Sequence, residues 1–374
     1  MLIHQRNVLQ TLLVLYFLLS YDGVQGEMKL SKLEELALEK QLNLLNKPSV
    51  KTIKMKPTLS RMKQIPSNST FDVSSKAWLE NEGCPSGTVP IKRVTKNDLI
   101  RQRRMPPPED LTFKSQLEDT NNILDAAAVG YTRAIVKTPD DPNNKFAGAG
   151  MIASLWNPHV GGTQHSASRM KIQKGSDSIQ VGWRVDPTLY GDTKTRFFVH
   201  FQAGNTQCFN TLCSGFVLVN NDIPLDGVFD SISHRGGRII WELIVYIDRD
   251  LANGNWWLLY GKNQVQVGFW PPRIFTALGN DFATNVEWGG VIYNSAGGSY
   301  PQMGAGVFPL PEPALDAYCR GLVILNDKGE TINAKKTLSV VDRQKYYRVD
   351  DRPYWAGGKF PHYMFFGGPY DPRG

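Results

Sequence analysis

From Tyr131 onwards, the chain consists largely of short segments in which apolar side chains recur at every second position. The sequence TRFFVHFQ at 195–202 and the sequence RIIWELIVYID at 238–248 both show this alternation. Asn253-Gly254, a dipeptide typical of tight hairpin turns, separates the second segment from NWWLLYG. Short strands at this spacing predict an all-β fold in which two antiparallel sheets pack face to face as a sandwich.

The first 26 residues have the parts of a secretory signal peptide. Arg6 lies in a polar start, an apolar run extends from Val8 to Leu19, and small residues precede Glu27. The run is much shorter than the ~20 apolar residues that a membrane-spanning helix requires. We therefore expect cleavage after Gly26, a secreted chain without a membrane anchor after cleavage, and an environment in which disulfides form.

Residues 27–128 differ in composition from the strands that follow. The sequence KLSKLEELALEKQLNLLNK has leucines at helical spacing, which predicts an amphipathic helix. A stretch from Pro57 to Pro108, rich in Pro, Ser, Lys and Arg, ends in RQRRMPPPED and predicts a linker or processing region. We expect a partly helical extension at 27–128, with a glycosylation sequon at Asn68, before a β-domain at 129–374.

Charge and missing motifs narrow the possible functions. The formal net charge is +7, but a large share of the basic residues precedes residue 105 and no nucleic-acid stacking motif accompanies them. We expect no nucleic-acid partner, whereas a basic segment of a secreted chain suits acidic surfaces such as cell-wall polymers. The sequence has no HExxH, GxSxG, CxxC or phosphate-binding glycine loop. His165, His200 and His234 lack metal-ligand spacing, so we expect no metal and no other cofactor.

The chain has four cysteines. Cys208 and Cys213 lie close enough in CFNTLC to close a small loop between two strands. Cys84 and Cys319 have no obvious local partner, so a bond between them, a bond between chains and two free thiols all stay open.

Two strand-like stretches, SIQVGWRV at 178–185 and NVEWGGVI at 285–292, each place one polar residue before a tryptophan-and-glycine cluster. Strand alternation puts Gln180 on the face opposite Trp183, and Glu287 on the face opposite Val286 and Trp288. We expect both polar side chains to point away from the core, beside glycines that leave room for a ligand, as on the floor of an open cleft.

Glu287 is the carboxylate best placed for chemistry. Partial desolvation by its apolar neighbours is expected to raise its pKa and to make it a general acid or base. A surface glutamate in an ordinary cross-strand pair is the alternative.

Several motifs in order resemble the plant neprosin family: VGWRVDPTLYGD, TRFF, CFNTLCSGFV, NWWLLYG, VGFWP, VEWGG, QMGAGVFP and FFGGP. Residues 27–128, with GCPSGTVPIKR, resemble its activation peptide. The resemblance implies a secreted glutamic endopeptidase, inhibited by its own propeptide, matured in acid and cleaving peptides or proteins after proline. It also implies a β-sandwich with two catalytic glutamates, one of which matches Glu287, and a Cys208–Cys213 disulfide.

The second family glutamate falls at Gln180. An amide cannot ionise or transfer a proton as a carboxyl group does. A fungal group of glutamic peptidases pairs one Gln with one Glu, so Gln180 is expected to orient water and stabilise the oxyanion while Glu287 acts as base and acid. An active enzyme, a slowed relative and an inactive binding protein all stay open. A C-terminal family disulfide is missing, since Tyr346-Tyr347 stands where the family has Cys-Tyr.

Four more positions match the family and are expected to line the cleft, where aromatic walls suit proline rings: Trp183, Tyr190, Trp288 and Gln302. Packing within the core is the alternative for the tryptophans. We further expect a monomer, located in the apoplast or cell wall.

Two other functions compete with peptide hydrolysis. A glycoside hydrolase needs a second carboxyl group at a defined separation from Glu287, and Asp186, Asp192 and Glu242 are the candidates. A wall-associated module that binds peptide or carbohydrate needs no second acid.

Overall fold

The computed structural model describes residues 31–46, 55–58, 84–85, 87–109, 129–355 and 361–369. The chain divides into two compact units, residues 1–47 and 48–374. The expected signal peptide and the sequon at Asn68 lie outside the described residues. None of the helices in the described ranges is long and apolar enough to cross a membrane.

The first unit contains the predicted amphipathic helix, α2 (Lys32–Leu45). It begins after Ser31, whose hydroxyl accepts a hydrogen bond from the backbone amide of Glu34. The Glu34 carboxylate in turn accepts one from the Ser31 amide at 2.9 Å. This reciprocal capping box satisfies amides that the first turn of a helix leaves unpaired, and it fixes where the helix starts.

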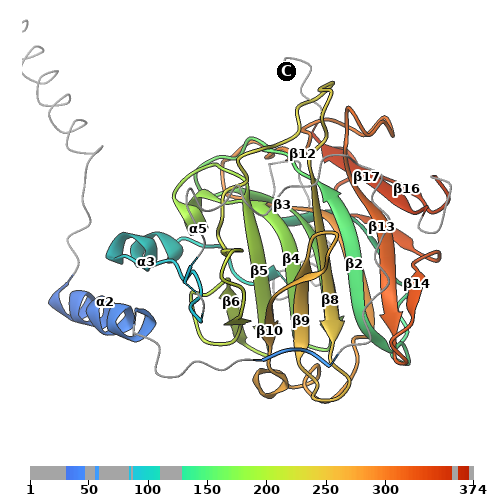
Figure 1. Ribbon diagram of the computed structural model, residues 1–374. Coiled ribbons are helices and arrows are strands. Elements are labelled where there is room, and N and C mark those ends of the chain that lie inside the picture. Colours follow the sequence, from blue (N-terminus) through green and yellow to red (C-terminus); the bar gives the residue numbers. More distant parts are fainter. Residues whose placement is uncertain are drawn as a thin grey trace, which may run out of the picture. The chain divides into compact units, whose positions relative to one another are not determined.

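The second unit is built on two packed antiparallel sheets, which confirms the predicted β-sandwich (Figure 1). In order across the seven-stranded sheet, the strands are β15 (Leu338–Val341), β1 (Gly130–Lys137), β11 (Asn285–Asn294), β3 (His165–Lys174), β4 (Asp177–Val185), β5 (Arg196–Ala203) and β6 (Thr206–Phe209).

The ten-stranded sheet covers the other side of the core. Its main path runs through β12 (Met303–Gly304), β17 (Tyr363–Gly368), β13 (Ala317–Asn326), β2 (Phe146–Ser154), β8 (Glu242–Arg249), β9 (Trp256–Tyr260), β10 (Val265–Trp270) and β7 (Val217–Leu218). Two further strands, β14 (Thr331–Asn333) and β16 (Arg348–Arg352), pair with β13 and β17. β8 and β9 form the hairpin predicted at Asn253-Gly254, where Gly254 has a φ of +76° that favours glycine.

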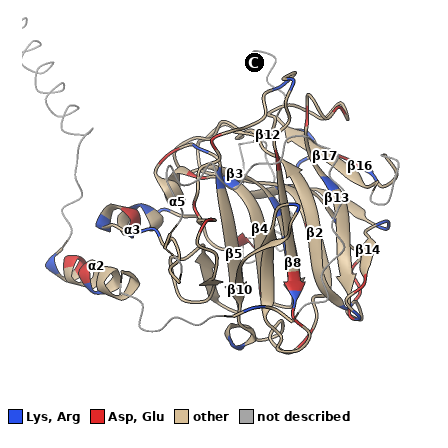
Figure 2. Ribbon diagram, viewed as in Figure 1, with Lys and Arg blue, Asp and Glu red and all other residues tan. Residues whose placement is uncertain are grey.

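The main core fills the space between the sheets. In Figure 2, basic residues interrupt β3, whereas β2 of the facing sheet has no charged residue. Trp183 of β4 donates its indole N–H to the Ser154 carbonyl at 2.9 Å, and Trp288 of β11 donates to the Gly150 carbonyl at 3.3 Å. Both tryptophans are fully buried in this core. The prediction that they line the cleft is therefore wrong, because alternation turns them to the face opposite Gln180 and Glu287.

The predicted Cys208–Cys213 disulfide is present, next to the end of β6. Cys84 and Cys319 are both free. Cys319 is buried on β13, where its Sγ lies 3.4 Å from Ser168 Oγ. The structure thus answers the question that the sequence left open for this pair.

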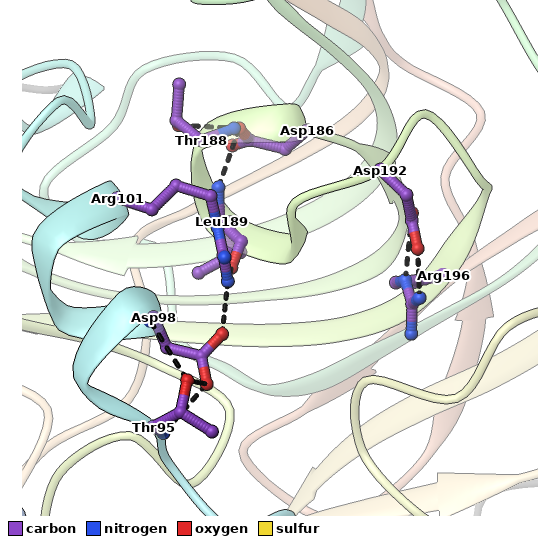
Figure 3. Close-up of polar contacts among 8 residues, drawn as sticks. All are labelled: Thr95, Asp98, Arg101, Asp186, Thr188, Leu189, Asp192 and Arg196. Atoms are coloured by element: carbon purple, nitrogen blue, oxygen red, sulfur yellow. Dashed lines mark hydrogen bonds and ion pairs between the residues drawn. The ribbon is translucent and has the colours of Figure 1, made fainter. Parts of the chain in front are cut away.

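Part of the stretch predicted as a linker forms a helix, α3 (Lys96–Gln102). Thr95 and Asp98 form a capping box at its start, and Arg101 pairs with Asp98. Arg101 also donates to the Leu189 carbonyl at 3.3 Å, which joins α3 to the short helix α5 (Pro187–Tyr190) after β4 (Figure 3). This contact anchors the extension to the sandwich ahead of residues 105–109.

Candidate active site

One row of paired residues crosses the seven-stranded sheet. Lys137 lies opposite Glu287, Glu287 opposite Lys171, Lys171 opposite Gln180, and Gln180 opposite His200. Directly opposed residues of antiparallel strands project from the same face. Because the neighbours of Gln180 and Glu287 along their strands are in the core, the whole row projects from the outer face. Gln180 of β4 and Glu287 of β11 therefore lie on the face that alternation predicts, with β3 between their strands.

Arg169, two residues before Lys171 on β3, joins the groups of the site. Its Nη2 donates to Glu287 Oε2 at 2.9 Å and also pairs with Glu109 Oε1. Only 1% of Arg169 is exposed. A buried guanidinium that contacts two carboxylates binds both through charge-assisted hydrogen bonds.

Glycines flank Arg169 on both sides, since Gly182 of β4 and Gly289 of β11 are its partners in the sheet. A Cβ at Gly182 would lie 2.0 Å from the Ser168 carbonyl oxygen, and one at Gly289 would lie 2.7 Å from the Ala134 carbonyl oxygen. The backbone of the neighbouring strands, rather than space for a ligand, thus requires glycine at these positions.

Glu109 completes the site, although it belongs to the N-terminal extension. Its Oε2 accepts a hydrogen bond from Gln180 Nε2 at 3.3 Å. The Tyr131 hydroxyl of β1 donates to the Pro107 carbonyl at 3.0 Å and fixes the residues before it. Exposure is 7% for Glu109, 6% for Gln180 and 5% for Glu287. The expected open cleft is therefore covered in the intact chain by its own residues.

The pKa of Glu287 is set by two opposing effects. Burial raises the pKa of this carboxyl, but the positive charges of Lys171 and Arg169 outweigh burial and hold the pKa below its ordinary value. The expectation of a raised pKa is therefore wrong, because cations on β3 face this glutamate. Glu287 is ionised in the folded chain and is able to accept a proton.

Acid is expected to loosen the contact that Glu109 makes. Burial raises the pKa of Glu109, but Arg169 and Lys171 reverse this effect and lower the pKa from 4.5 to about 2. A carboxyl group with a lower pKa in the folded state stabilises it above the unfolded pKa and loses that contribution as the pH falls through the folded pKa. The attachment of residues 87–109 should therefore weaken as the pH falls from about 4.5 to about 2.

Hydrogen exchange of the 87–109 amides, corrected for intrinsic rates, measures this loosening. Glu109→Gln is the matched control, since its amide cannot titrate and the acid-dependent step should disappear. An equal step in both proteins would contradict the assignment to Glu109.

The other predicted cleft residues lie in different surroundings. Tyr190 is buried on α5, and the Arg196 guanidinium lies 5.3 Å from its ring centroid. Gln302 accepts a hydrogen bond from the His159 amide at 2.9 Å and lines a cavity of about 830 Å³ whose lining residues include neither Gln180 nor Glu287. The structure does not bring these two residues to the Glu287 site.

The candidate second acids also have other partners. Asp186 accepts from the amides that begin α5, Asp192 pairs with Arg196, and Glu242 on the ten-stranded sheet pairs with Arg320. The carboxylate that shares Arg169 with Glu287 is Glu109. Within the described ranges, no group of three or more His, Cys, Asp or Glu side chains is arranged to hold a metal ion.

Aromatic rings extend the outer face beyond the charged row. Tyr131, Tyr293 and His165 oppose one another across β1, β11 and β3. The Tyr131 ring centroid lies 5.1 Å from that of Tyr293 and 5.4 Å from that of His165. Ile135 and Val291 join the two tyrosines in a small apolar cluster. These side chains, apart from Tyr293, are buried in the intact chain.

The fold and the site together define a class: an antiparallel β-sandwich with a glutamate, a glutamine and an arginine on the outer face of one sheet. The model of the Neprosin family matches residues 162–369, more than half of the chain, so the chain belongs to the Neprosin family. The matched region includes β3, β4 and β11, which carry Arg169, Gln180 and Glu287.

Solved structures show low similarity to this chain. Scytalido-glutamic peptidase with a peptide-based transition-state analogue is 11% identical, with 64% of this chain and 98% of that chain covered and a TM-score of 0.33. SCP-B, a member of the Eqolisin family of peptidases in complex with the tripeptide Ala-Ile-His, has the same identity, coverage and TM-score. CG-16, a homodimeric agglutinin from chicken liver, is 10% identical, with 43% and 95% covered and a TM-score of 0.23.

Proposed function

We propose that this chain is a glutamic-type endopeptidase that is secreted, made as an inactive precursor, active in acid and specific for cleavage after proline. The observation that carries the proposal is the placement of Glu287 and Gln180 on one outer face, on either side of Lys171. Membership of the Neprosin family supports the peptidase class.

In the proposed reaction, Glu287 acts first as a general base. Its ionised carboxylate removes a proton from a water molecule, whose oxygen attacks the scissile carbonyl carbon. Glu287 then donates that proton to the nitrogen of the leaving amine as the peptide bond breaks. The positive charges of Arg169 and Lys171 favour the ionised form that the first step requires.

Gln180 supplies the second polar group. Its amide N–H is a donor to the oxyanion that forms on the attacked carbonyl, and its amide oxygen is an acceptor that orients the water. Neither role requires ionisation, so a glutamine is chemically sufficient for both. Glu109 accepts a hydrogen bond from this amide group in the intact chain, which supports the view that the extension blocks the site.

Cleavage of blocked peptides that each contain one proline tests the proposal. The full-length protein is assayed before and after acid treatment, from pH 2 to 7. We expect cleavage after proline, in acid, and only after treatment. Equal cleavage after other residues would contradict the proposed specificity for proline. An absence of cleavage under every condition would contradict the proposal that the chain is a peptidase. A chain recovered from the culture medium should begin at Glu27.

Gln180→Ala is expected to lower kcat by roughly 10²- to 10³-fold, the usual effect of losing one oxyanion donor. The value of KM should change much less, because the lost contact forms mainly in the transition state. Kinetics on the best prolyl peptide give both quantities, and unchanged cleavage would exclude this role for Gln180.

Gln180→Glu tests the second candidate, an inactive wall-associated protein that binds peptide or carbohydrate. The absence of the second family carboxyl favours this candidate. If the natural protein cleaves no peptide and the Gln180→Glu variant does, the natural protein is the inactive binding protein rather than the peptidase.

A further inference from the structure

We infer that Arg169 and Gln180 form a carboxylate-binding subsite, held by Glu109 in the intact chain, which accepts the acidic side chain of a substrate peptide. The inference deepens the proposed function and rests on it for the identity of the ligand as a substrate. Binding of the carboxylate is a separate step that can be measured without cleavage.

The geometry of Glu109 defines the subsite. One carboxylate oxygen pairs with Arg169 of β3, and the other accepts from Gln180 of β4 at 3.3 Å. Arg169 keeps additional donors, because its Nε and Nη1 are buried and have no hydrogen-bond partner among the described residues. A carboxylate has enough lone pairs to accept from both strands at once, and the Gln180 amide has two N–H groups, so one can bind this carboxylate while the other donates to the oxyanion.

The charge of Arg169 also favours an anion. Arg169 is 1% exposed, and it contacts both Glu287 and Glu109. Removing one partner from a buried charge is destabilising, so Arg169 favours another carboxylate when Glu109 leaves.

The surrounding ionisable groups on this face have their own partners. Arg133 and Lys137 of β1 pair with Asp342 and Asp140, and Arg184 of β4 pairs with Asp186. Burial, the largest effect on His200, lowers its pKa to about 4, so this ring is neutral above that pH. The carboxylate of Glu109 is therefore bound by the two groups that it contacts, Arg169 and Gln180.

Gln180 suits a carboxylate ligand better than glutamate would. Its Nε2 donates to Glu109, whereas an ionised glutamate has no proton to donate and would repel the ligand. The replacement of the family carboxyl by an amide thus has a chemical consequence beyond the loss of an acid, since it turns the position into a carboxylate donor site.

The residues before Glu109 indicate the kind of peptide. Pro106, Pro107 and Pro108 precede it, Pro106 is buried, and the Tyr131 hydroxyl binds the Pro107 carbonyl. Consecutive prolines hold a chain extended. The extension therefore presents an acidic side chain after prolines, which is the arrangement that a proline-containing acidic substrate would copy.

The test uses the full chain with Glu109→Ala, which removes the carboxylate and keeps the backbone. Acetate and acetamide, which have nearly the same shape, are the probes, and calorimetry or NMR titration measures their binding at pH 6. We expect acetate to bind at least roughly tenfold more tightly than acetamide, as charge-assisted hydrogen bonds predict. Acetate should also raise the Tm of this variant.

Three controls fix the location. Adding Gln180→Glu to Glu109→Ala should abolish the preference for acetate. Glu109→Gln, whose amide fills the subsite, should bind neither probe. If Glu109→Ala does not fold, Glu109→Ser, which also lacks the carboxylate, replaces it as the reference. Asp350→Ala removes a carboxylate that pairs with Arg352 on the ten-stranded sheet, and acetate should not raise its Tm. Equal binding of acetate and acetamide to Glu109→Ala would overturn the subsite.

Peptides distinguish an acidic side chain from a chain terminus as the source of the carboxylate. Acetyl-Pro-Pro-Glu-amide should bind Glu109→Ala more tightly than acetyl-Pro-Pro-Gln-amide and more tightly than acetyl-Pro-Pro with a free C-terminus. Preference for the free C-terminus would overturn the assignment to an acidic side chain. A protein that binds acetate but never cleaves a peptide would contradict the proposed function and leave the carboxylate subsite standing.

Discussion

Glu287→Gln is expected to reduce the rate of peptide cleavage by roughly 10²- to 10⁴-fold, the usual contribution of a general acid–base group. The substituted amide keeps the shape of the side chain but can neither accept a proton from water nor return one to the leaving amine. The measurement is kcat on the best prolyl peptide at the pH of maximal activity. Circular dichroism and Tm verify that the variant is folded, because Arg169 loses one ionic partner.

Asp192→Asn is the matched control for Glu287→Gln. It also converts a carboxylate of the sandwich into an amide, but Asp192 pairs with Arg196 rather than with the groups around Glu287 (Figure 3). Its activity should equal that of the natural protein. Cleavage by Glu287→Gln at a similar rate would mean that the reaction takes place without this residue.

The acid limb of the pH profile gives a second view of Glu287. Its pKa lies below 4.5 because Lys171 and Arg169 outweigh burial, and the charge of Glu109 raises it. Departure of Glu109 removes that opposing effect. The opened enzyme should therefore keep Glu287 ionised, and kcat/KM high, further into acid than an ordinary glutamate would allow.

The period-two pattern was sufficient to predict the sandwich and the direction of individual side chains. In β4 and β11, the apolar residues that point to the core are every second residue, so Gln180 and Glu287 had to share the outer face. The same rule contradicts the family-based expectation for Trp183 and Trp288. Local alternation predicted the direction of these side chains correctly because a large apolar indole is stabilised by burial between the two sheets.

Strand alternation also predicts the position of two cations, Arg169 and Lys171, that sequence reasoning missed. Arg169 and Lys171 flank the buried Met170, so alternation alone places both on the outer face. Their effect on Glu287 reverses the sign of the pKa shift expected from burial. The direction of a pKa shift therefore cannot be predicted from the apolar neighbours of a carboxylate along its own strand, because charged residues on the paired strand can reverse it.

No sequence pattern predicted that Glu109 contacts the site. It follows three prolines in a segment without periodicity, 60 residues before Arg169 and 71 before Gln180 along the chain. Strand patterns give the face of a side chain but not the partner that a distant segment brings to it. The contact depends on the attachment of α3 to α5, which depends in turn on single polar contacts such as Arg101 with the Leu189 carbonyl.

Arg169→Met is expected to destabilise the folded chain by about 3 to 5 kcal/mol, the usual cost of removing one partner from a buried ionic group. Methionine fills a similar volume, but it leaves Glu109 and Glu287 buried without the guanidinium that contacts both. The pKa of each carboxyl should rise, so residues 87–109 should be released at a higher pH than in the natural protein.

Urea unfolding at pH 7 gives the stability, and hydrogen exchange of residues 87–109 gives the pH of release. Arg352→Met is the control, because Arg352 pairs with Asp350 in an exposed position where water screens the interaction, and its effect should be much smaller. Adding Glu109→Gln to Arg169→Met should recover part of the loss, since one of the two carboxylates that lack the guanidinium is then uncharged. If Arg169→Met were no more destabilising than Arg352→Met, the site would not depend on the arginine to hold its carboxylates, and the carboxylate subsite would fail together with the acid-dependent release of Glu109.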